Sequence, residues 1–372
     1  MVDLKGQYQN IKTEIDAKLQ EVVVSTAFIN GQEVKNFQKE LENYLDVKHV
    51  IPCGNGTDAL QIAMMALGLK SGDEVITVDF TFAATVEVIA LLGLTPVLVD
   101  VESDTFNIDI DSLQKAITPK TKAIVPVHLF GQAANMDAIM KIAKENNLFI
   151  IEDTAQAIGA DFIFKNGKTQ KVGTIGTVGT TSFFPSKNLG AYGDGGAIFT
   201  NDDDLAVKLR SIVNHGMSTK RYYYDKIGVN SRLDSLQAAV LRIKLPHLDA
   251  YATARQKVAA YYDKAFANCD KIRTPKRSTF STHVFHQYTL VVKDINRDEL
   301  HEFLKENDIP NAIYYPVPLH TQVAYKDFKF DPKSLTTTIN LCKEVLSLPM
   351  HTEMCEEQLE YITSKILEFI EQ

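Results

Sequence analysis

Cysteine is scarce in this sequence, and its few residues follow no pattern. Cys53, Cys269, Cys342 and Cys355 show no C-x-x-C spacing, so the sequence indicates neither a zinc site nor a disulfide framework. We therefore expect a reducing compartment, the cytoplasm. The histidines likewise contain no compact ligand pattern such as H-E-x-x-H, and we expect no metal site.

Long apolar runs and an excess of positive charge are also missing. No uninterrupted apolar stretch approaches the roughly 18 residues that suggest a membrane span. The first residues contain no basic region followed by an apolar one, so we expect no signal peptide. A net charge of −8 argues against nonspecific nucleic-acid binding by the whole surface.

The sequence does contain an alternation of short strands and longer helices. This alternation predicts an α/β fold, a mainly parallel sheet with helices on both faces, and the glycines at 193–196 predict a turn into one antiparallel strand. At 372 residues the chain is long enough for two domains. We place them at 1–245 and 246–372, divided near Pro246, the second being a smaller α+β domain. The expected strands are 49–53, 75–78, 97–99, 122–127, 149–151, 180–184, 197–200 and 287–292, and the expected helices are 13–25, 31–44, 237–244, 298–307 and 356–371.

A lysine stands in a turn directly after one of these strands. Lys187 follows the segment 180–184 and lies between Pro185 and Gly190. A lysine held at the carboxyl edge of a sheet, and partly desolvated there, can form a Schiff base with a carbonyl. The alternative, a solvated loop lysine, is the more common case for a lysine taken alone.

Two further segments favour the chemical interpretation of this lysine. Glu152 and Asp153 follow the strand at 149–151, at the edge where open α/β sheets bind ligands. Gly54 and Gly56 lie between a strand and a helix start, where free backbone N–H groups suit a phosphate. An acid, a lysine and a phosphate cradle at strand ends together predict a pyridoxal phosphate pocket.

The same glycine segment also matches a different motif. Residues 54–59 fit the loose dinucleotide fingerprint G-x-G-x-x-A, and Asp79 follows a second strand about where a ribose-binding acid is expected. An NAD-dependent oxidoreductase is therefore an alternative, although it gives no task to Lys187 or Asp153. The glycines at 173, 176 and 179 are more typical of a turn between strands than of a phosphate loop.

Short motifs along nearly the whole chain resemble one family. They lie at residues 3–8, 55–60, 80–85, 126–131, 152–156, 182–190, 193–197, 230–234 and 315–320. In order and spacing the chain is similar to the DegT/StrS-type nucleotide-sugar aminotransferases, a branch of the aspartate-aminotransferase-like pyridoxal phosphate enzymes. The resemblance implies their type I fold, with a mainly parallel seven-stranded sheet sandwiched by helices and a smaller C-terminal α+β domain.

The resemblance implies roles around the cofactor ring. Lys187 is the residue that bonds to the cofactor aldehyde and later carries a proton, and Asp153 keeps the ring nitrogen protonated. A helix N-cap is the alternative role for Asp153. Gln156 is expected to bond the ring hydroxyl. Phe82 is expected to stack on the ring, although either phenylalanine of the segment 80–82 could simply belong to the core.

The resemblance also implies how the phosphate is held. The candidates are Gly56, Thr57, Ser182 and Asn230, the last reaching in from a second subunit. This role requires a homodimer with shared active sites, whereas Asn230 taken alone could equally be a turn residue.

Candidate substrate-binding residues are Arg232, Tyr315 and His320. Arg232 suits a structural salt bridge as well as a substrate contact, and His320 suits packing as well as a pocket. The run 221–224, Arg-Tyr-Tyr-Tyr, predicts a mobile loop over an active site, with a nucleic-acid stacking patch and a surface hairpin as alternatives.

The family's reaction is a transamination in two halves. L-Glutamate gives its amine to the cofactor and leaves as 2-oxoglutarate, and the keto group of a nucleotide-linked sugar then receives the amine. Some relatives carry histidine in place of the lysine and are dehydratases, so Lys187 favours transamination. A noncatalytic regulator on the same fold is a further alternative, which predicts a missing lysine or an altered phosphate cradle.

Two motifs restrict the identity of the sugar substrate. Residues 193–201 and 228–234 are most similar to members that aminate C3, including those that make 3-amino-3-deoxy-glucuronate derivatives of UDP-GlcNAc for surface polysaccharide such as the O-antigen of lipopolysaccharide. The chain departs from these uronate members at Tyr314, where they have a histidine before the Tyr-Pro pair. A 3-keto-6-deoxy sugar on dTDP is the next candidate.

Overall fold

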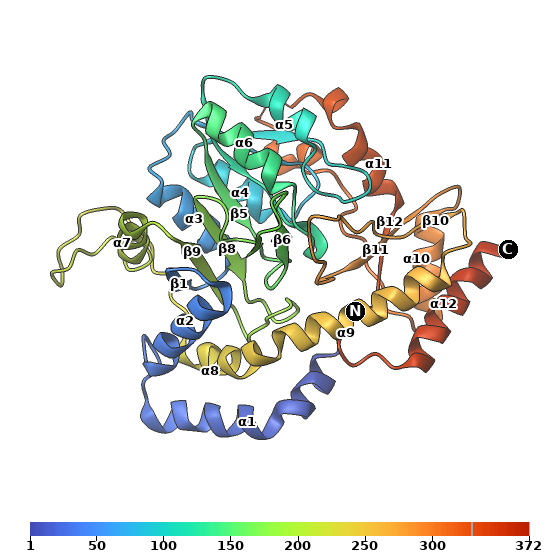
Figure 1. Ribbon diagram of the computed structural model, residues 1–372, viewed down its shortest axis with the longest axis horizontal. Coiled ribbons are helices and arrows are strands. Elements are labelled where there is room, and N and C mark those ends of the chain that lie inside the picture. The colour runs from blue at the N-terminus through green and yellow to red at the C-terminus, as the bar shows by residue number, and fades with distance from the viewer. Residues whose placement is uncertain (329, 372) are drawn as a thin grey trace.

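A seven-stranded sheet forms the centre of the computed structural model, which describes residues 1–328 and 330–371 (Figure 1). The strand order is β1, β9, β8, β5, β4, β2, β3, and only β9 runs against the others. The mainly parallel seven-stranded sheet is therefore confirmed. Its strands are β1 (His49–Cys53), β2 (Glu74–Val78), β3 (Thr95–Val99), β4 (Thr121–Val125), β5 (Phe149–Asp153), β8 (Val178–Ser182) and β9 (Gly196–Thr200).

Helices cover both faces of this sheet. One face is covered by α3 (Gly56–Ala66), α4 (Ala84–Leu91) and α7 (Asp203–Ile212). The opposite face is covered by α2 (Gln32–Leu45), α5 (Ile110–Ala116), α6 (Met136–Asn146) and α8 (Ser235–Lys244). The helix α1 (Leu4–Ser25) packs on the outside of α8 and forms the lowest layer in Figure 1.

The central strands are apolar on both sides because both faces are buried. In β4, Ile124 contacts one core, whereas Ala123 and Val125 contact the core on the opposite face. A strand covered on both faces reads as a continuous apolar run without alternation. This explains why the strand segments are recognisable in the sequence.

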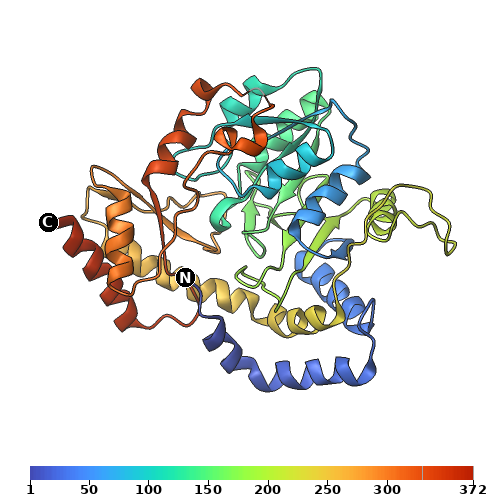
Figure 2. The same ribbon diagram turned by 180° about the vertical axis from the view of Figure 1, so that it is seen from behind.

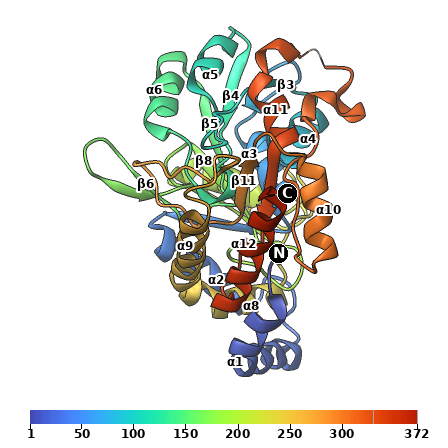
Figure 3. The ribbon, with the colours of Figure 1, turned by 90° about the vertical axis from the view of Figure 1, so that its right-hand side faces the viewer.

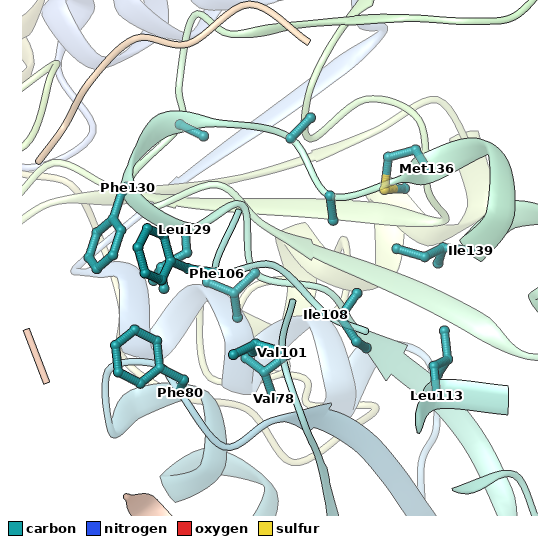
Figure 4. Close-up of a cluster of buried hydrophobic side chains, with 14 of the residues drawn as sticks. Val78, Phe80, Val101, Phe106, Ile108, Leu113, Leu129, Phe130, Met136 and Ile139 are labelled. Carbon is teal, nitrogen blue, oxygen red and sulfur yellow. The ribbon is translucent and has the colours of Figure 1, made fainter. Parts of the chain in front are cut away.

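An aromatic cluster lies just beyond the carboxyl ends of the strands (Figure 4). Phe80 follows β2, Phe106 follows β3 and Phe130 follows β4, and all three are buried. The ring centroids of Phe106 and Phe130 are 5.3 Å apart in an edge-on arrangement. Burial of each ring contributes about 2 kcal/mol, so the cluster holds together the loops that leave this edge of the sheet.

The C-terminal part of the chain builds a smaller antiparallel sheet. Its strands are β10 (Ile272–Arg273), β11 (Tyr288–Val292) and β12 (Val345–Leu348), in that order. Around its core pack α9 (Leu248–Ala265), α10 (Arg297–Glu306) and α12 (Glu356–Glu371), as the side view in Figure 3 shows. The smaller α+β arrangement agrees with the sequence expectation.

No extended linker separates the large sheet from the smaller sheet in the described part of the chain. Pro246 lies in the 3-10 turn Leu245–His247, and α8 and α9 follow each other along one side of the molecule (Figure 2). The helix α11 (Thr336–Glu344) returns to the large sheet, where Asp100 after β3 accepts bonds at 2.8 Å from the N–H groups of Thr337 and Thr338. The division into residues 1–245 and 246–372 stays a prediction.

Some elements differ from the sequence expectations. The helix α1 begins at Leu4 rather than at residue 13, because Asp3 caps it by accepting a bond from the Gly6 N–H. The strand β8 ends at Ser182 rather than at residue 184, because Ser182 Oγ accepts a bond from the Phe184 N–H in the following turn. The hairpin of β6 (Asp161–Ile163) and β7 (Thr169–Lys171) was not expected, since three-residue strands are too short to show a periodic pattern.

Glu152, the first of the two acids at the end of β5, has a structural role. The Glu152 carboxylate is fully buried and accepts bonds from the N–H groups of Gly173, Ile175 and Gly176 at 2.6–2.8 Å. His128 Nδ1 accepts a bond from the Ala134 N–H, so its Nε2–H donates to Glu152 at 3.0 Å. These bonds shape the segment before β8, which confirms that Gly173 and Gly176 mark a turn, whereas Gly179 lies within β8. Among the described residues, no helix combines the length and apolar character needed to cross a membrane.

We predict that Glu152→Gln destabilises the fold strongly. An amide in this position turns an NH2 group toward backbone donors, and a buried bond to a charged group is lost, at a cost of about 3 kcal/mol. Chemical denaturation should show this decrease in the free energy of unfolding. Glu145→Gln is the matched control, since Glu145 is half-exposed on α6. Equal stability of the two variants would contradict the role given to Glu152.

Candidate active site

A cavity of about 640 Å³ opens at the carboxyl ends of β5 and β8. The N-terminus of α3 borders it, as does the C-terminal segment that contains Tyr314 and Tyr315. The predicted site residues that line this cavity are Gly56, Thr57, Phe82, Asp153, Gln156, Ser182, Lys187 and Tyr315.

The start of α3 presents free donors to the cavity. Asn55 caps the helix by accepting a bond from the Asp58 N–H at 2.8 Å, whereas the N–H groups of Gly56 and Thr57 have no hydrogen bond within the described part of the chain. A Cβ at Gly56 would lie 2.7 Å from the Cβ of Ser182, so glycine is required for the helix to approach β8. Two free N–H groups at a helix N-terminus beside two hydroxyls suit a phosphate.

Asp153 is a buried carboxylate at the end of β5. It accepts bonds from the Ala155 N–H at 3.0 Å and from Thr85 Oγ1 at 3.1 Å. Burial raises the pKa of Asp153, and these two donors and Lys187 only oppose the effect. A protonated ring nitrogen would supply the missing positive partner. No helix follows β5 directly, so the helix N-cap alternative is wrong.

Lys187 lies in a tightly packed turn after β8. A Cβ at Gly190 would lie 2.2 Å from the Pro185 carbonyl oxygen, and the buried Lys244 Nζ donates to the Gly190 carbonyl at 2.8 Å. Burial lowers the pKa of Lys187 from 10.5 to about 8, against the attraction of Asp153. The lysine is therefore desolvated, and it loses its proton near pH 8 rather than near pH 10.5.

The two phenylalanines of the segment 80–82 have different positions. Phe80 belongs to the aromatic cluster and is 1% exposed, whereas Phe82 is 60% exposed and lines the cavity. An exposed aromatic ring at a cavity wall is suited to stack on a flat ligand. The core alternative therefore applies to Phe80 and not to Phe82.

Gln156 links the large sheet to the C-terminal segment. Its Oε1 accepts a bond from the Phe130 N–H at 2.8 Å, and its Nε2 donates to the Tyr315 hydroxyl at 3.1 Å. The amide has a second N–H that these bonds leave free. Gln156 can therefore donate into the cavity, as a bond to a ring hydroxyl requires.

Asn230 and Arg232 do not line the cavity of their own chain. Arg232 donates to Asn230 and, at 2.9 Å, to Asn214 Oδ1, and Asn230 is exposed. Between them Ser231 Oγ donates to the Asp58 carboxylate at 2.6 Å and accepts a bond from the Gly54 N–H. Ser231 thus contacts the turn that leads into α3 of the same chain, on the side away from the cavity.

His320 also lies away from the cavity wall. Its backbone N–H and its Nδ1 contact the two carboxylate oxygens of the buried Asp79 at 2.8 and 2.7 Å. The packing alternative for His320 is the one that the geometry shows. Both carboxylate oxygens of Asp79 are therefore already hydrogen-bonded to His320. The dinucleotide hypothesis needs Asp79 to bind a ribose, so these contacts argue against it.

The aromatic run at 221–224 forms a projecting hairpin. The Ser218 N–H donates to the Tyr223 carbonyl at 2.7 Å, and Tyr222, Tyr223 and Tyr224 are more than half exposed. The hairpin extends from the end of α7 away from the body of the molecule, at the far left of Figure 1. It does not cover the cavity of its own chain, where a loop over the active site was expected, and a surface hairpin is what the structure shows.

The cavity wall also contains residues for which no role was predicted from the sequence. Thr85 and Asp194 belong to motifs of the resemblance, so their positions could have been recognised. In the sequence, Tyr314 is notable only because the uronate members have a histidine there. His286 belongs to the histidines that show no metal-ligand pattern, and no other role is predicted for it. These lining residues are Thr85, Glu87, Asp194, His286 and Tyr314.

Comparison with known proteins gives relatives along the whole chain. The protein is 50% identical to a "Pleiotropic regulatory protein" of Geobacillus stearothermophilus over 99% of this chain and 98% of that one. It is 47% identical to the "UDP-2-acetamido-2-deoxy-3-oxo-D-glucuronate aminotransferase" of Pseudomonas aeruginosa over 94% of both chains. It is 37% identical to the "dTDP-3-amino-3,4,6-trideoxy-alpha-D-glucose transaminase" of Streptomyces venezuelae over 100% of this chain and 96% of that one.

Solved structures show the same fold. A DegT DnrJ EryC1 StrS aminotransferase from Brucella abortus superposes with a TM-score of 0.94 at 42% identity, covering 99% of this chain and 98% of that one. NtdA from Bacillus subtilis, solved with bound cofactor PMP, gives a TM-score of 0.88 at 31% identity, covering 98% of this chain and 82% of that one. The expected type I fold is thereby confirmed.

The family follows from these similarities. Residues 9–367 match the DegT/DnrJ/EryC1/StrS aminotransferase family, whose members are enzymes dependent on pyridoxal phosphate. The free N–H groups at Gly56 and Thr57, the buried Asp153 and the desolvated Lys187 fit that cofactor. The chain therefore belongs to the DegT/DnrJ/EryC1/StrS aminotransferase family and is an aminotransferase with pyridoxal phosphate as its cofactor.

Proposed function

We propose that the enzyme transfers an amino group from L-glutamate to the C3 keto group of a nucleotide-linked sugar. The observation that carries this proposal is the single cavity that contains both Lys187 and Asp153 at adjacent strand ends. The sugar and its C3 position rest on the names of the two enzyme relatives, both of which handle an amine or oxo group at position 3.

The cofactor would be held by groups from four segments. Gly56, Thr57 and Ser182 would bind its phosphate, Phe82 would cover one face of its ring and Gln156 would donate to its ring hydroxyl. When bound, pyridoxal phosphate supplies an electron sink for the Cα–H bond of the amino donor. Asp153 and the protonated ring nitrogen would stabilise each other as an ion pair. The positive charge on the nitrogen would keep the ring able to accept electrons.

Lys187 would have two roles in this cavity. As a neutral amine it would bond to the cofactor aldehyde with loss of water, and once displaced by the amino donor it would take up the proton of the donor Cα and return it to the cofactor. Both roles need an amine that loses its proton near neutral pH. The lowered pKa of about 8 provides this property.

The identity of the sugar is open at two points. One enzyme relative is named for a UDP-linked glucuronate and the other for a dTDP-linked deoxy sugar. Tyr314 lines the cavity. By the resemblance described above, the uronate members have a histidine before the Tyr-Pro pair, and a tyrosine there offers no positive charge to a carboxylate. We therefore propose a sugar without a carboxylate, in the biosynthesis of a surface polysaccharide such as an O-antigen.

We further propose that the active enzyme is a homodimer in the cytoplasm. Asn230 and Arg232 lie outside the cavity of their own chain, and the exposed hairpin at 215–229 projects beside them. We propose that this region completes the cavity of a second copy. The described cysteines are free thiols, which suits a reducing compartment.

A purely regulatory role is not favoured. One relative is named as a regulatory protein, and such a role predicts a missing lysine or an altered phosphate cradle. The chain has both Lys187 and the free N–H groups of α3.

We predict that the cofactor attaches faster as the pH rises through about 8 and at a constant rate above it, because Lys187 becomes neutral there. Stopped-flow absorbance after mixing the apoenzyme with pyridoxal phosphate measures this rate. In Asp153→Asn the carboxylate that favours the ammonium is gone, so the midpoint should move to lower pH. A rate that keeps rising toward pH 10.5, the ordinary lysine value, would contradict the desolvated amine.

We also predict that the reverse reaction distinguishes the amino position. The enzyme with 2-oxoglutarate should form glutamate from a UDP- or dTDP-linked 3-amino sugar, and at a rate at least tenfold lower from the 4-amino isomer, since a misplaced reacting atom costs at least this factor. Coupled detection of glutamate measures both rates, with Lys187→Ala as the inactive control. Faster reaction of the 4-amino isomer would refute the C3 proposal, and a higher rate with a 3-amino uronate than with its neutral counterpart would refute the choice of sugar.

A further inference from the structure

One buried ring in the cavity wall has no role in the account above. His286 lies just before β11, lines the cavity and is only 5% exposed. Its main chain is fixed from two sides. The Val284 N–H donates to the Gly131 carbonyl at 2.8 Å, and the buried Arg255 guanidinium donates to the carbonyls of Phe285 and His286 at 3.0 and 3.4 Å.

The hydrogen bonds of Asn188 determine which ring nitrogen carries the proton. Asn188 directly follows Lys187, and its Nδ2 donates to the Val284 carbonyl at 3.0 Å. Its Oδ1 therefore faces His286 Nδ1, at 3.2 Å, and the Nδ1–H of His286 is the donor. In a neutral ring the other nitrogen, Nε2, is then an acceptor, and within the described part of the chain no side chain or backbone group donates to it.

The surroundings keep this ring neutral. Burial lowers the pKa of His286 well below 6.5, and the positive charges of Lys187 and Arg255 lower it further. The imidazole is thus a permanent acceptor at its Nε2 over the working pH range. An acceptor in a cavity wall that has no donor within the protein is open to a donor that enters or is released into the cavity during the reaction.

The amine of Lys187 is the donor that the geometry favours. Lys187 and His286 line the same cavity, and Asn188 connects the lysine turn to the histidine ring. Among the described residues Lys187 Nζ donates no hydrogen bond, and the charge of Asp153 is the one influence that favours its ammonium form. An ammonium that carries the donor's proton in a buried cavity is costly without an acceptor.

We propose that His286 Nε2 accepts a hydrogen bond from the Lys187 amine after the amino donor has displaced it, and so positions Nζ for proton transfer. His286 is a positioning residue in this proposal, because it acts through Lys187. The proposal rests on the aminotransferase activity of the family and not on the identity of the sugar.

Two substitutions separate this role from a structural one. In His286→Asn the side-chain amide takes the place of Nδ1 and can still donate to Asn188, but the cavity loses its acceptor. In His286→Gln an amide oxygen takes the place of Nε2, whereas the bond to Asn188 is lost. The pair therefore removes the two functions of the ring one at a time.

The test is the amino-donor half-reaction of the holoenzyme, followed by stopped-flow absorbance with whichever amino acid converts the wild type fastest. We expect His286→Asn to slow the limiting rate about 10- to 100-fold, the effect of one hydrogen bond to a charged group, with little change in the amino acid concentration at half-saturation. His286→Gln should stay within a few-fold of the wild type. The opposite order, or equal losses in both variants, would overturn the proposal and leave His286 a structural partner of Asn188.

Two controls make every outcome decisive. Pyridoxal phosphate titration and thermal unfolding should show cofactor-loaded, folded protein for both variants, and Asn188→Ala should resemble His286→Gln rather than His286→Asn. Failure of the nucleotide-sugar assay with a normal half-reaction would refute the proposed substrate but not the role of His286.

Discussion

The parallel pairing of β5 with β8 is the constraint on which the site depends. Asp153 lies opposite Thr180 in this pair, and the Thr154 N–H donates to the Thr180 carbonyl at 2.8 Å. Because parallel strands end at the same edge, the pairing places the Asp153 carboxylate and the Lys187 turn on one side of the sheet. The position of the chemical groups in the cavity therefore follows from the register of this strand pair.

The two acids at the end of β5 divide structural and chemical work. Glu152 is satisfied by backbone N–H groups and by His128, and it shapes the turn that leads into β8. Asp153, one residue later, faces the opposite side of the strand and remains short of positive partners. The hydrogen-bonded Glu152 thus fixes the strand end that carries Asp153, a carboxylate whose burial alone is unfavourable. Such unfavourably buried groups are common in active sites.

Much of the fold and the site could be predicted from the sequence because the signals were local. The buried strands are continuous apolar runs, and the residues at their ends are contained in short motifs, so Asp153, Lys187 and the α3 turn were found. Contacts between distant segments could not be predicted in the same way. His320 binds Asp79 across 241 residues of sequence, and His286 meets Asn188 across 98, and neither pair has a signature in its own segment. The role that we propose for Asn230 and Arg232 requires a second copy of the chain, so the geometry of one chain does not test it.

The most direct test of this account is to locate the cofactor on the chain. Reduction of the holoenzyme with borohydride, followed by digestion and mass spectrometry, identifies the lysine that is bonded to pyridoxal phosphate. We expect the reduced label on the peptide that contains Lys187. A label on Lys244, whose pKa burial also lowers to about 8, or on no lysine at all, would contradict the account.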